Sequence, residues 1–376
     1  MNRNQEKKIP ILITGGHHDP AVAVIEALQE RGNFQFFWVG HRYSLSGEQT
    51  ESAEFKNITR LGIPFFELKT GKLYRSSWQE LIKLPLGFLH ALYLLMRIRP
   101  RIVISFGGYL AAPVVLAAYL LRIPAVTHEQ TVVFGWANRF IALFAKRIFV
   151  SWKSSLKYFP SGKTVLTGNP IRQEVFEERT KRFRFKNGLP VVYVTGGKQG
   201  SHIINEAIRG ALSQFLEKYN LVHQTGSSER FQDYQKLSIL KNQLPKKLQD
   251  RYILQEYFGL DEIGSVYAAA ALVVGRAGAN TVTELAALGK PAILVPIPWV
   301  SRREQFLNAQ ILAERGAAVV LEEGRFSSRV LLQALETVFS SLKEHQKAAV
   351  ECRQLVYPQA ASQIASEIIR LINASR

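Results

Sequence analysis

The chain of 376 residues lacks three features that mark common classes of protein. It has one cysteine, Cys352, which excludes an internal disulfide framework and a cysteine metal cluster and is typical of a reducing, cytoplasmic setting. The polar residues 1–8 lead directly into an expected strand, so we expect no secretory signal peptide. No apolar run reaches the roughly 20 uninterrupted residues that a membrane span needs.

Acidic residues are scarce relative to basic ones. The 48 Lys and Arg against 30 Asp and Glu give a formal charge of +18 and a pI near 9.9. This charge indicates an acidic partner, namely nucleic acid, anionic lipid or a phosphorylated substrate, although it can also serve solubility alone. Apolar residues make up 47% of the chain, which argues against disorder, and the length suits two domains of about 100 to 200 residues each.

Residues 72–101 contain the most apolar stretch of the chain. Four residues interrupt it: Lys83, Pro85, His90 and Arg97. Apolar and aromatic side chains cover more of this expected helix than one buried stripe needs, and cations lie at both of its ends. The pattern fits a helix resting on an anionic bilayer surface, and a broadly buried core helix is the alternative.

Three loops of the amino-terminal half follow expected strands. Strands at 9–14 and 101–106 lead into Gly15-Gly16-His17 and Gly107-Gly108-Tyr109, and a strand at 124–127 leads into His128-Glu129-Gln130-Thr131. In a parallel sheet these loops lie at one edge, where ligands bind. His17 can serve as a base or bind a phosphate, and a surface or capping histidine is the alternative.

The carboxyl-terminal half repeats the alternation. A strand at 190–195 precedes the glycine loop 196–201 and a helix at 203–219, and residues 273–296 read as strand, glycine turn, helix and strand. A helix beginning at Gly278 to Asn280 presents free N–H groups to a phosphate, and Glu284 can accept hydrogen bonds from ribose hydroxyls. An ordinary βαβ crossover is the alternative.

These patterns predict an α/β protein of two doubly wound, Rossmann-like domains that face each other across a cleft. We expect an amino-terminal domain at 1–176, a charged linker at 177–188 and a carboxyl-terminal domain at 189–355. A last helix within 356–376 has apolar residues at helical spacing and is expected to pack back toward the first domain.

The order and spacing of seven short motifs resemble the MurG family of UDP-N-acetylglucosamine transferases, which make lipid II for peptidoglycan. The resemblance runs from about Ile11 to the carboxyl terminus and rests on 107–109, 128–130, 168–172, 196–200, 223–226, 276–284 and 305–309. It implies a GT-B fold, a hexosyltransferase that needs no cofactor, and a role in cell-wall biogenesis, cell shape and cell division. It also implies peripheral attachment to the cytoplasmic face of the cell membrane.

The resemblance also implies a role for individual residues. On the acceptor side it implies Gly15, Gly16, His17, Gly107, Gly108, Tyr109, His128, Glu129 and Thr131. On the donor side it implies Arg172, Lys198, Gln199, Gly200, Phe258, Gly278, Ala279, Asn280, Thr281, Glu284, Gln305 and Asn308. Glu284 would hold the UDP ribose, Phe258 would lie near uracil, and Arg172 would face a diphosphate.

The sequence departs from the family pattern at the first glycine loop and at three single positions further along the chain. The first glycine loop is shorter than the usual G-G-T-G-G-H, and His18-Asp19 follow where apolar residues are common. Thr131 stands for an asparagine, Lys198 for a serine, and Ala277 for the serine of R-S-G. All lie in the expected site, so they bear on the identity of the acceptor.

The implied reaction is inverting transfer of N-acetylglucosamine from UDP-N-acetylglucosamine to lipid I, with His17 or Glu129 as the general base. The chain contains no Asp-x-Asp motif, which disfavours a metal-dependent transferase, so we expect no metal site. The alternatives are a related transferase with another lipid or polysaccharide acceptor, a UDP-N-acetylglucosamine 2-epimerase and a silent UDP-sugar-binding protein. A nucleic-acid-binding protein would explain the charge but not the glycine loops, so we expect no nucleic-acid partner.

Overall fold

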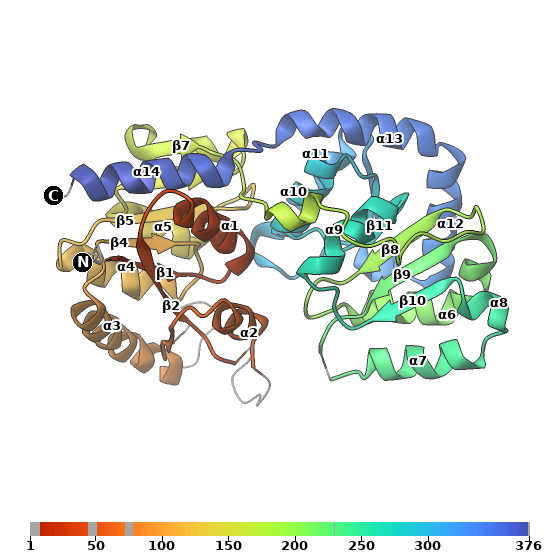
Figure 1. Cartoon of the computed structure of the whole chain (residues 1–376), viewed down its shortest axis with the longest axis horizontal. Helices are drawn as coiled ribbons and strands as arrows, with labels where there is room; N and C mark the ends of the chain where they lie inside the picture. The colour runs from red at the N-terminus through yellow and green to blue at the C-terminus, as the bar shows by residue number, and fades with distance from the viewer. Residues whose placement is uncertain (1–7, 44–50, 72–77, 229, 375–376) are drawn as a thin grey trace, which may run out of the picture. The chain divides into compact units, whose positions relative to one another are not determined.

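The computed structural model describes residues 8–43, 51–71, 78–228 and 230–374. These residues form two compact units, Met1–Ile171 with Tyr357–Arg376 and Arg172–Val356. In each unit, helices cover a central sheet (Figure 1). The basic start of the segment expected at a membrane, Lys72 to Arg75, lies outside the described residues, as do the side chains of Trp78, Leu81 and Ile82.

The first unit contains a parallel sheet with the order β3-β2-β1-β4-β5-β6-β7. The strands are β1 (Ile9–Thr14), β2 (Phe34–Gly40), β3 (Phe65–Glu67), β4 (Ile102–Ser105), β5 (Ala125–Glu129), β6 (Arg147–Val150) and β7 (Thr164–Leu166). The chain reverses its direction of winding between β1 and β4. The loops after these two strands therefore meet at the switch point where doubly wound sheets bind ligands.

Helices cover both faces of this sheet. They are α1 (His18–Gln29), α2 (Ala53–Arg60), α3 (Trp78–Ile98), α4 (Ala111–Leu120), α5 (Trp136–Phe144) and α14 (Ala360–Ala374). Ile11 and Ile13 point from β1 into a core with α1 and α14, whereas Leu12 points into a core with α3, α4 and α5. This alternation is the side-chain period of a strand buried on both faces.

The carboxyl-terminal helix α14 belongs to the core of the first unit. Its Ile364 and Ile368 are fully buried beside α1. Arg31, just after α1, donates to the carbonyl of Ser362 at 2.8 Å and to the hydroxyl of Ser366 at 2.7 Å. Apolar burial and these bonds together hold α14 against α1.

The second unit contains a parallel sheet with the order β10-β9-β8-β11-β12-β13. The strands are β8 (Val191–Thr195), β9 (Asn220–Gln224), β10 (Tyr252–Gln255), β11 (Leu272–Gly275), β12 (Ala292–Leu294) and β13 (Ala318–Val320). Its winding reverses between β8 and β11. Both predicted doubly wound α/β domains are therefore confirmed.

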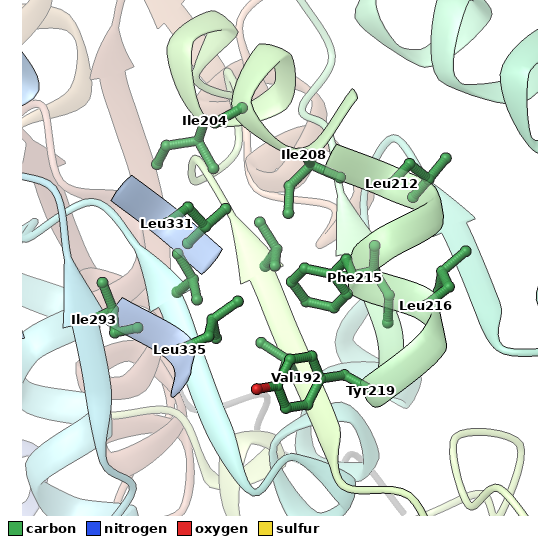
Figure 2. Close-up of a cluster of buried hydrophobic side chains, with 14 of the residues drawn as sticks. Val192, Ile204, Ile208, Leu212, Phe215, Leu216, Tyr219, Ile293, Leu331 and Leu335 are labelled. Carbon is green, nitrogen blue, oxygen red and sulfur yellow. The ribbon is translucent and has the colours of Figure 1, made fainter. Parts of the chain in front are cut away.

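The helices of the second unit pack on both faces of its sheet. They are α6 (His202–Lys218), α7 (Asp233–Gln243), α8 (Lys246–Gln249), α9 (Leu260–Ala269), α10 (Ala279–Leu288), α11 (Glu304–Ala313), α12 (Ser328–Ser340) and α13 (Leu342–Glu351). Figure 2 shows Phe215 of α6 and Leu335 of α12 with Val192 of β8. On the opposite face, the Tyr193 ring contacts the rings of Phe258 and Tyr267 at centroid distances of 6.1 and 5.5 Å.

The charged segment 177–188 runs along α9 in the second unit. The backbone N–H groups of Arg179 and Thr180 both donate to the Ser265 hydroxyl at 2.9 Å. Gly264 of α9 allows the close approach, because a Cβ atom there would lie 2.2 Å from the carbonyl oxygen of Glu177. The segment therefore has fixed contacts with α9 as well as solvated side chains.

Helix α3 has a buried face and an exposed apolar face. Ala91, Leu94 and Leu95 are buried in the core, whereas Leu89 and Met96 are 59% and 55% exposed. None of the helices in the described part of the chain combines the length and hydropathy that crossing a membrane requires. The buried face fits the interpretation as a core helix, and contact of the exposed face with a membrane stays a prediction.

Raising the pH is expected to destabilise the first unit through Glu54. This carboxylate accepts a hydrogen bond from Trp38 Nε1 at 2.5 Å, and burial raises its pKa from 4.5 to about 7. Its contribution to the free energy of unfolding is therefore fully present below pH 4.5 and is lost as the pH rises through 7, by about 3 kcal/mol. Urea unfolding at about pH 5.5 and about pH 8.5, followed by tryptophan fluorescence, should show about 2 kcal/mol of this loss, because the rest occurs below pH 5.5.

The variant Glu54→Gln keeps an acceptor for Trp38 but cannot ionise, so it should remove most of that pH dependence. The exposed Glu30→Gln variant is the control, because it removes a carboxylate of the same unit without touching Trp38. Equal pH dependence in the wild type and in Glu54→Gln would contradict the prediction.

Candidate active site

Two glycine turns meet at the switch point of the first sheet. The N–H of Gly16, after β1, donates to the carbonyl of Gly107, after β4, at 3.3 Å. Gly15 has a φ of +139°, and a Cβ atom there would lie 2.8 Å from the backbone of Phe106. The predicted meeting of these loops therefore requires glycine on the β1 side.

The two adjacent histidines of the first loop have different environments. His17 is exposed, whereas His18 is buried and its Nε2 accepts from Asn57 Nδ2 of α2 at 3.0 Å. His18 Nε2 also lies 3.8 Å from the Asp19 carboxylate. The polar His18-Asp19 pair, which departs from the family pattern, thus joins the start of α1 to α2 and leaves His17 at the surface.

His128, near the end of β5, is buried and neutral. Its Nε2 donates to the carbonyl of Gly168 at 3.0 Å, while Nδ1 has no hydrogen-bond partner among the described residues. Burial lowers the pKa of His128 from 6.5 to about 4; the Gly168 bond opposes this shift and the charge of nearby His17 adds to it. His17 and His128 therefore interact electrostatically.

Glu129 anchors the loop that follows β5. Its carboxylate accepts from the Thr131 N–H at 3.1 Å, the Thr131 hydroxyl at 2.9 Å and Asn138 Nδ2 at 2.7 Å. The residue is 3% exposed, and burial raises its pKa. Thr131, in place of the family asparagine, thus holds a buried carboxylate.

Tyr109 follows the second glycine turn and contacts His41, the residue just after β2. Its hydroxyl lies 2.5 Å from Nε2 of His41, and the two rings are tilted at a centroid distance of 5.5 Å. Sequence reasoning missed His41, because it is 68 positions away and belongs to no motif.

In the second unit, two more glycine turns pack backbone to backbone. A Cβ atom on Gly226, after β9, would lie 2.1 Å from the nitrogen of Gly200, after β8. The N–H of Ser227 donates to the carbonyl of Lys198 at 3.0 Å. On the same loop, the Lys198 side chain is half-buried and the Gln199 side chain is exposed.

Gln224 joins the loops that follow β8 and β10. Its Nε2 donates to the Thr195 hydroxyl and to the Gly197 carbonyl, each at 3.1 Å, and its Oε1 accepts from the Phe258 N–H at 3.0 Å. The Phe258 ring is 1% exposed and packs edge-on against Phe183. The structure therefore places this ring in the core, and only the backbone of Phe258 joins the loops.

Helix α10 begins at the expected glycine turn after β11. Gly278 is its N-cap, Asn280 and Thr281 are half-buried in its first turn, and Gly289 ends it with a φ of +66°. Glu284 is half-buried, and its Oε2 accepts from the Tyr267 hydroxyl of α9 at 2.9 Å. Tyr267 was not predicted, since it lies on another helix.

Other expected donor residues have structural contacts. Gln305 Oε1 accepts from the Ile297 N–H at 3.1 Å. Asn308 is fully buried and donates to the Ala277 carbonyl at 3.3 Å. Arg172 is 9% exposed and precedes the short helix Gln173–Phe176. Arg276, just after the end of β11, donates to the carbonyl of Val295 at 3.0 Å and forms a half-buried ion pair with Glu323.

Within the described residues, three potential metal ligands lie close together: His202, Glu206 and Asp233. Each already has a partner. Asp233 accepts from His202 Nδ1 and from Asn205 Nδ2, both at 2.8 Å. Both oxygens of Glu206 bind Arg209. Because a cation already neutralises Glu206, this cluster is an internal hydrogen-bond network.

Models of two protein-family domains match most of the chain. The glycosyltransferase family 28 N-terminal domain matches residues 14–150, and the glycosyltransferase family 28 C-terminal domain matches residues 191–364. A UDP-N-acetylglucosamine–N-acetylmuramyl-(pentapeptide) pyrophosphoryl-undecaprenol N-acetylglucosamine transferase from Lachnoclostridium phytofermentans is 34% identical over 91% of this chain and 92% of its own. The chain belongs to the MurG family. It is therefore a glycosyltransferase with a GT-B fold.

Solved structures agree with this MurG assignment. The crystal structure of MurG from Acinetobacter baumannii is 27% identical, with a TM-score of 0.69 over 96% of this chain and 99% of that chain. A UDP-GlcNAc 2-epimerase from Neisseria meningitidis has a TM-score of 0.62 over 96% of this chain and 99% of that chain, at 14% identity. At that identity the likeness shows a shared fold alone.

The close approach of Gly200 and Gly226 predicts different effects for two glycine substitutions. Gly226 and Gly197 both have left-handed backbones, with φ of +87° and +84°, but a Cβ atom on Gly197 meets nothing within 4 Å. Gly197→Ala should therefore cost only the backbone strain, about 1 kcal/mol. Gly226→Ala should cost more, on the order of 3 kcal/mol or above, because the loops must also separate. Calorimetric unfolding compares them, and equal losses would contradict the packing argument.

Proposed function

We propose that this chain transfers N-acetylglucosamine from UDP-N-acetylglucosamine to the 4-hydroxyl of the muramoyl sugar in lipid I, forming lipid II. The main support for this proposal is the sequence identity, above 30% along nearly the whole chain, with a relative that is named for this reaction. The acceptor hydroxyl attacks the anomeric carbon from the face opposite the leaving group. Its oxygen forms the new glycosidic bond, the bond from that carbon to the phosphate oxygen breaks, and UDP leaves.

The donor half would be built at the switch point between β8 and β11. The amino terminus of α10, with Gly278 as its N-cap, presents the positive end of a helix dipole, which stabilises the charge that develops on the leaving diphosphate. Arg172 and Lys198 add positive charge, and Glu284 accepts from the ribose. The residues Gln199, Gly200, Phe258, Gly278, Ala279, Asn280, Thr281, Gln305 and Asn308 complete the proposed donor site.

His17 is our choice for the general base. It is exposed, and its neighbour His128 is kept neutral by burial, so no fixed positive charge opposes the proton that His17 takes up. Glu129, the second candidate, has its carboxylate engaged by Thr131 and Asn138 in a buried position. We therefore assign Glu129 to holding the acceptor loop.

The acceptor half would include the glycine turns at 15–16 and 107–108 and the side chains of Tyr109, His128 and Thr131. The shortened first loop offers fewer N–H groups to a phosphate than the family pattern does. This observation favours one alternative, a transfer reaction with another lipid or polysaccharide acceptor. A screen of acceptors with one donor separates the two.

An exposed apolar surface suits attachment to a membrane. Helices α3, α4 and α5 pack side by side and expose nine large apolar side chains: Leu86, Leu89, Tyr93, Met96, Tyr119, Leu120, Trp136, Phe140 and Leu143. We call this set the apolar surface of the first unit. Arg97 and Arg139 lie on the same helices, as an anionic bilayer would require. We propose peripheral attachment to the cytoplasmic face of the cell membrane.

Incubation with UDP-N-acetylglucosamine and a lipid I analogue in detergent or vesicles should release UDP and yield the disaccharide product. Replacing His17 with Ala should lower kcat by about 10²- to 10⁴-fold, because the acceptor proton then has no positioned base. Coupled UDP detection and chromatography of the lipid product measure both.

His345→Ala is the matched control. His345 lies in α13 of the second unit, where it binds the Gly316 carbonyl at 2.6 Å, and it has no role in the proposed site. It should keep full activity. Absence of UDP release from the wild type would refute the proposed reaction, and unchanged turnover in His17→Ala would remove only the base assignment. Conversion of the donor to UDP-N-acetylmannosamine would instead indicate an epimerase.

Charged substitutions on the apolar surface should weaken binding to anionic vesicles. Leu143 is 68% exposed on α5, so Leu143→Glu removes buried apolar contact with the bilayer and adds repulsion. We expect roughly a tenfold loss of vesicle affinity in sedimentation assays at moderate salt. Ile239→Glu is the control, because Ile239 is 61% exposed on α7 of the second unit. Equal losses in both variants would refute this surface as the membrane contact.

A further inference from the structure

We propose that Tyr267 is a positioning residue for the donor ribose, acting by holding Glu284 in its binding orientation. The Tyr267 hydroxyl donates to Glu284 Oε2 at 2.9 Å. This inference rests on the proposed function, because it requires that Glu284 accept hydrogen bonds from the ribose hydroxyls.

The Tyr267 side chain is itself fixed. It is 3% exposed, and its ring packs edge-on against Tyr193 of β8 at a centroid distance of 5.5 Å and an interplanar angle of 90°. A buried aromatic ring has two side-chain torsions, and packing determines both. The hydroxyl therefore occupies a set position between α9 and α10.

Glu284 gains a preferred orientation from this bond. A half-buried glutamate on a helix has several side-chain rotamers, and one fixed donor favours the rotamer that reaches it. A carboxylate has about four lone-pair sites, and the Tyr267 bond uses one of them.

A second phenol lies close to the same carboxylate. Burial raises the pKa of Tyr193 well above its usual value; a hydrogen bond with Thr195 opposes this shift, and the negative charge of Glu284 adds to it. Tyr193 therefore stays neutral, and it adds no negative charge beside Glu284. Two tyrosines packed edge to face, Tyr193 and Tyr267, thus lie close to the Glu284 carboxylate.

Binding of UDP and of 2′-deoxy-UDP, measured by calorimetry without acceptor, tests the inference. The wild type should bind UDP more tightly than 2′-deoxy-UDP, because 2′-deoxy-UDP lacks the ribose 2′-hydroxyl that donates to Glu284. Tyr267→Phe should weaken UDP binding about tenfold, the size expected for one hydrogen bond to a charged group. The same substitution should change the affinity for 2′-deoxy-UDP by less than about threefold. This ligand has no 2′-hydroxyl, so its binding depends less on the orientation of the Glu284 carboxylate.

Turnover gives a second readout. Tyr267→Phe should raise KM for the sugar nucleotide about tenfold and leave kcat within about twofold, because the ribose lies far from the reacting bond. The double variant Tyr267→Phe with Glu284→Ala should bind UDP no more weakly than Glu284→Ala alone. Tyr219→Phe is the control, since it removes another buried phenol of the same unit, on the opposite face of the sheet (Figure 2).

Two results are decisive in different ways. A wild-type protein that does not distinguish UDP from 2′-deoxy-UDP would remove the ribose role of Glu284 and hence the donor assignment of the proposed function. A wild-type protein that does distinguish them, with Tyr267→Phe weakening both ligands equally, would overturn only the role of Tyr267. Equal weakening is the result expected from a purely structural tyrosine.

Discussion

The second unit depends on a backbone contact between two glycine turns. Gly200 and Gly226 approach so closely that neither could carry a Cβ atom without overlap of about 1 Å or more with the other turn. This contact brings the loops after β8 and β9 together, and Gln224 then links them to the loop after β10 through three hydrogen bonds. Because the loops hold one another, the edge of the sheet at the switch point is organised before any ligand binds, and this lowers the entropy that binding must overcome.

Both units contain two glycine turns in contact, and in the first unit three histidines lie beside them. His17, His18 and His128 lie around one glycine turn and have three different roles, set by exposure, by Asn57 and by burial. A neutral His128 is the physical consequence of removing an imidazole from water without a carboxylate beside it. The buried His128 therefore adds an imidazole beside the glycine turn without adding a positive charge.

The alternation of strands, glycine turns and helices could be predicted, because buried parallel strands are short apolar runs and helix ends need glycine or proline. The ends of the expected helix 203–219 differ by one residue from those of α6 at 202–218. Helices α12 and α13 were not assigned, although Leu331 and Leu335 lie one helical turn apart. Their polar faces and the absence of a glycine turn hide the pattern.

The site could be predicted only in part, since sequence motifs give positions on elements but not side-chain environments. Glu129 ends β5 and Phe258 follows β10, yet the Glu129 carboxylate is enclosed by Thr131 and Asn138 and the Phe258 ring lies in the core. The partners that decide these environments come from other elements, as Tyr267 does for Glu284. Spacing along one strand or helix contains no information about such pairs.

Two departures from the family pattern follow one physical rule: a substituted residue must leave the buried polar groups around it with hydrogen-bond partners. Ala277 is fully buried, and its carbonyl accepts from Asn308, so the missing serine hydroxyl leaves no polar atom unpaired there. Thr131 supplies a hydroxyl to Glu129 where an asparagine would supply an amide. These two substitutions therefore preserve the frame of the site. The shortened loop at Gly15 and Gly16 has no such compensation in its own sequence, and for this reason the proposed acceptor site is where we expect this chain to differ most from its relatives.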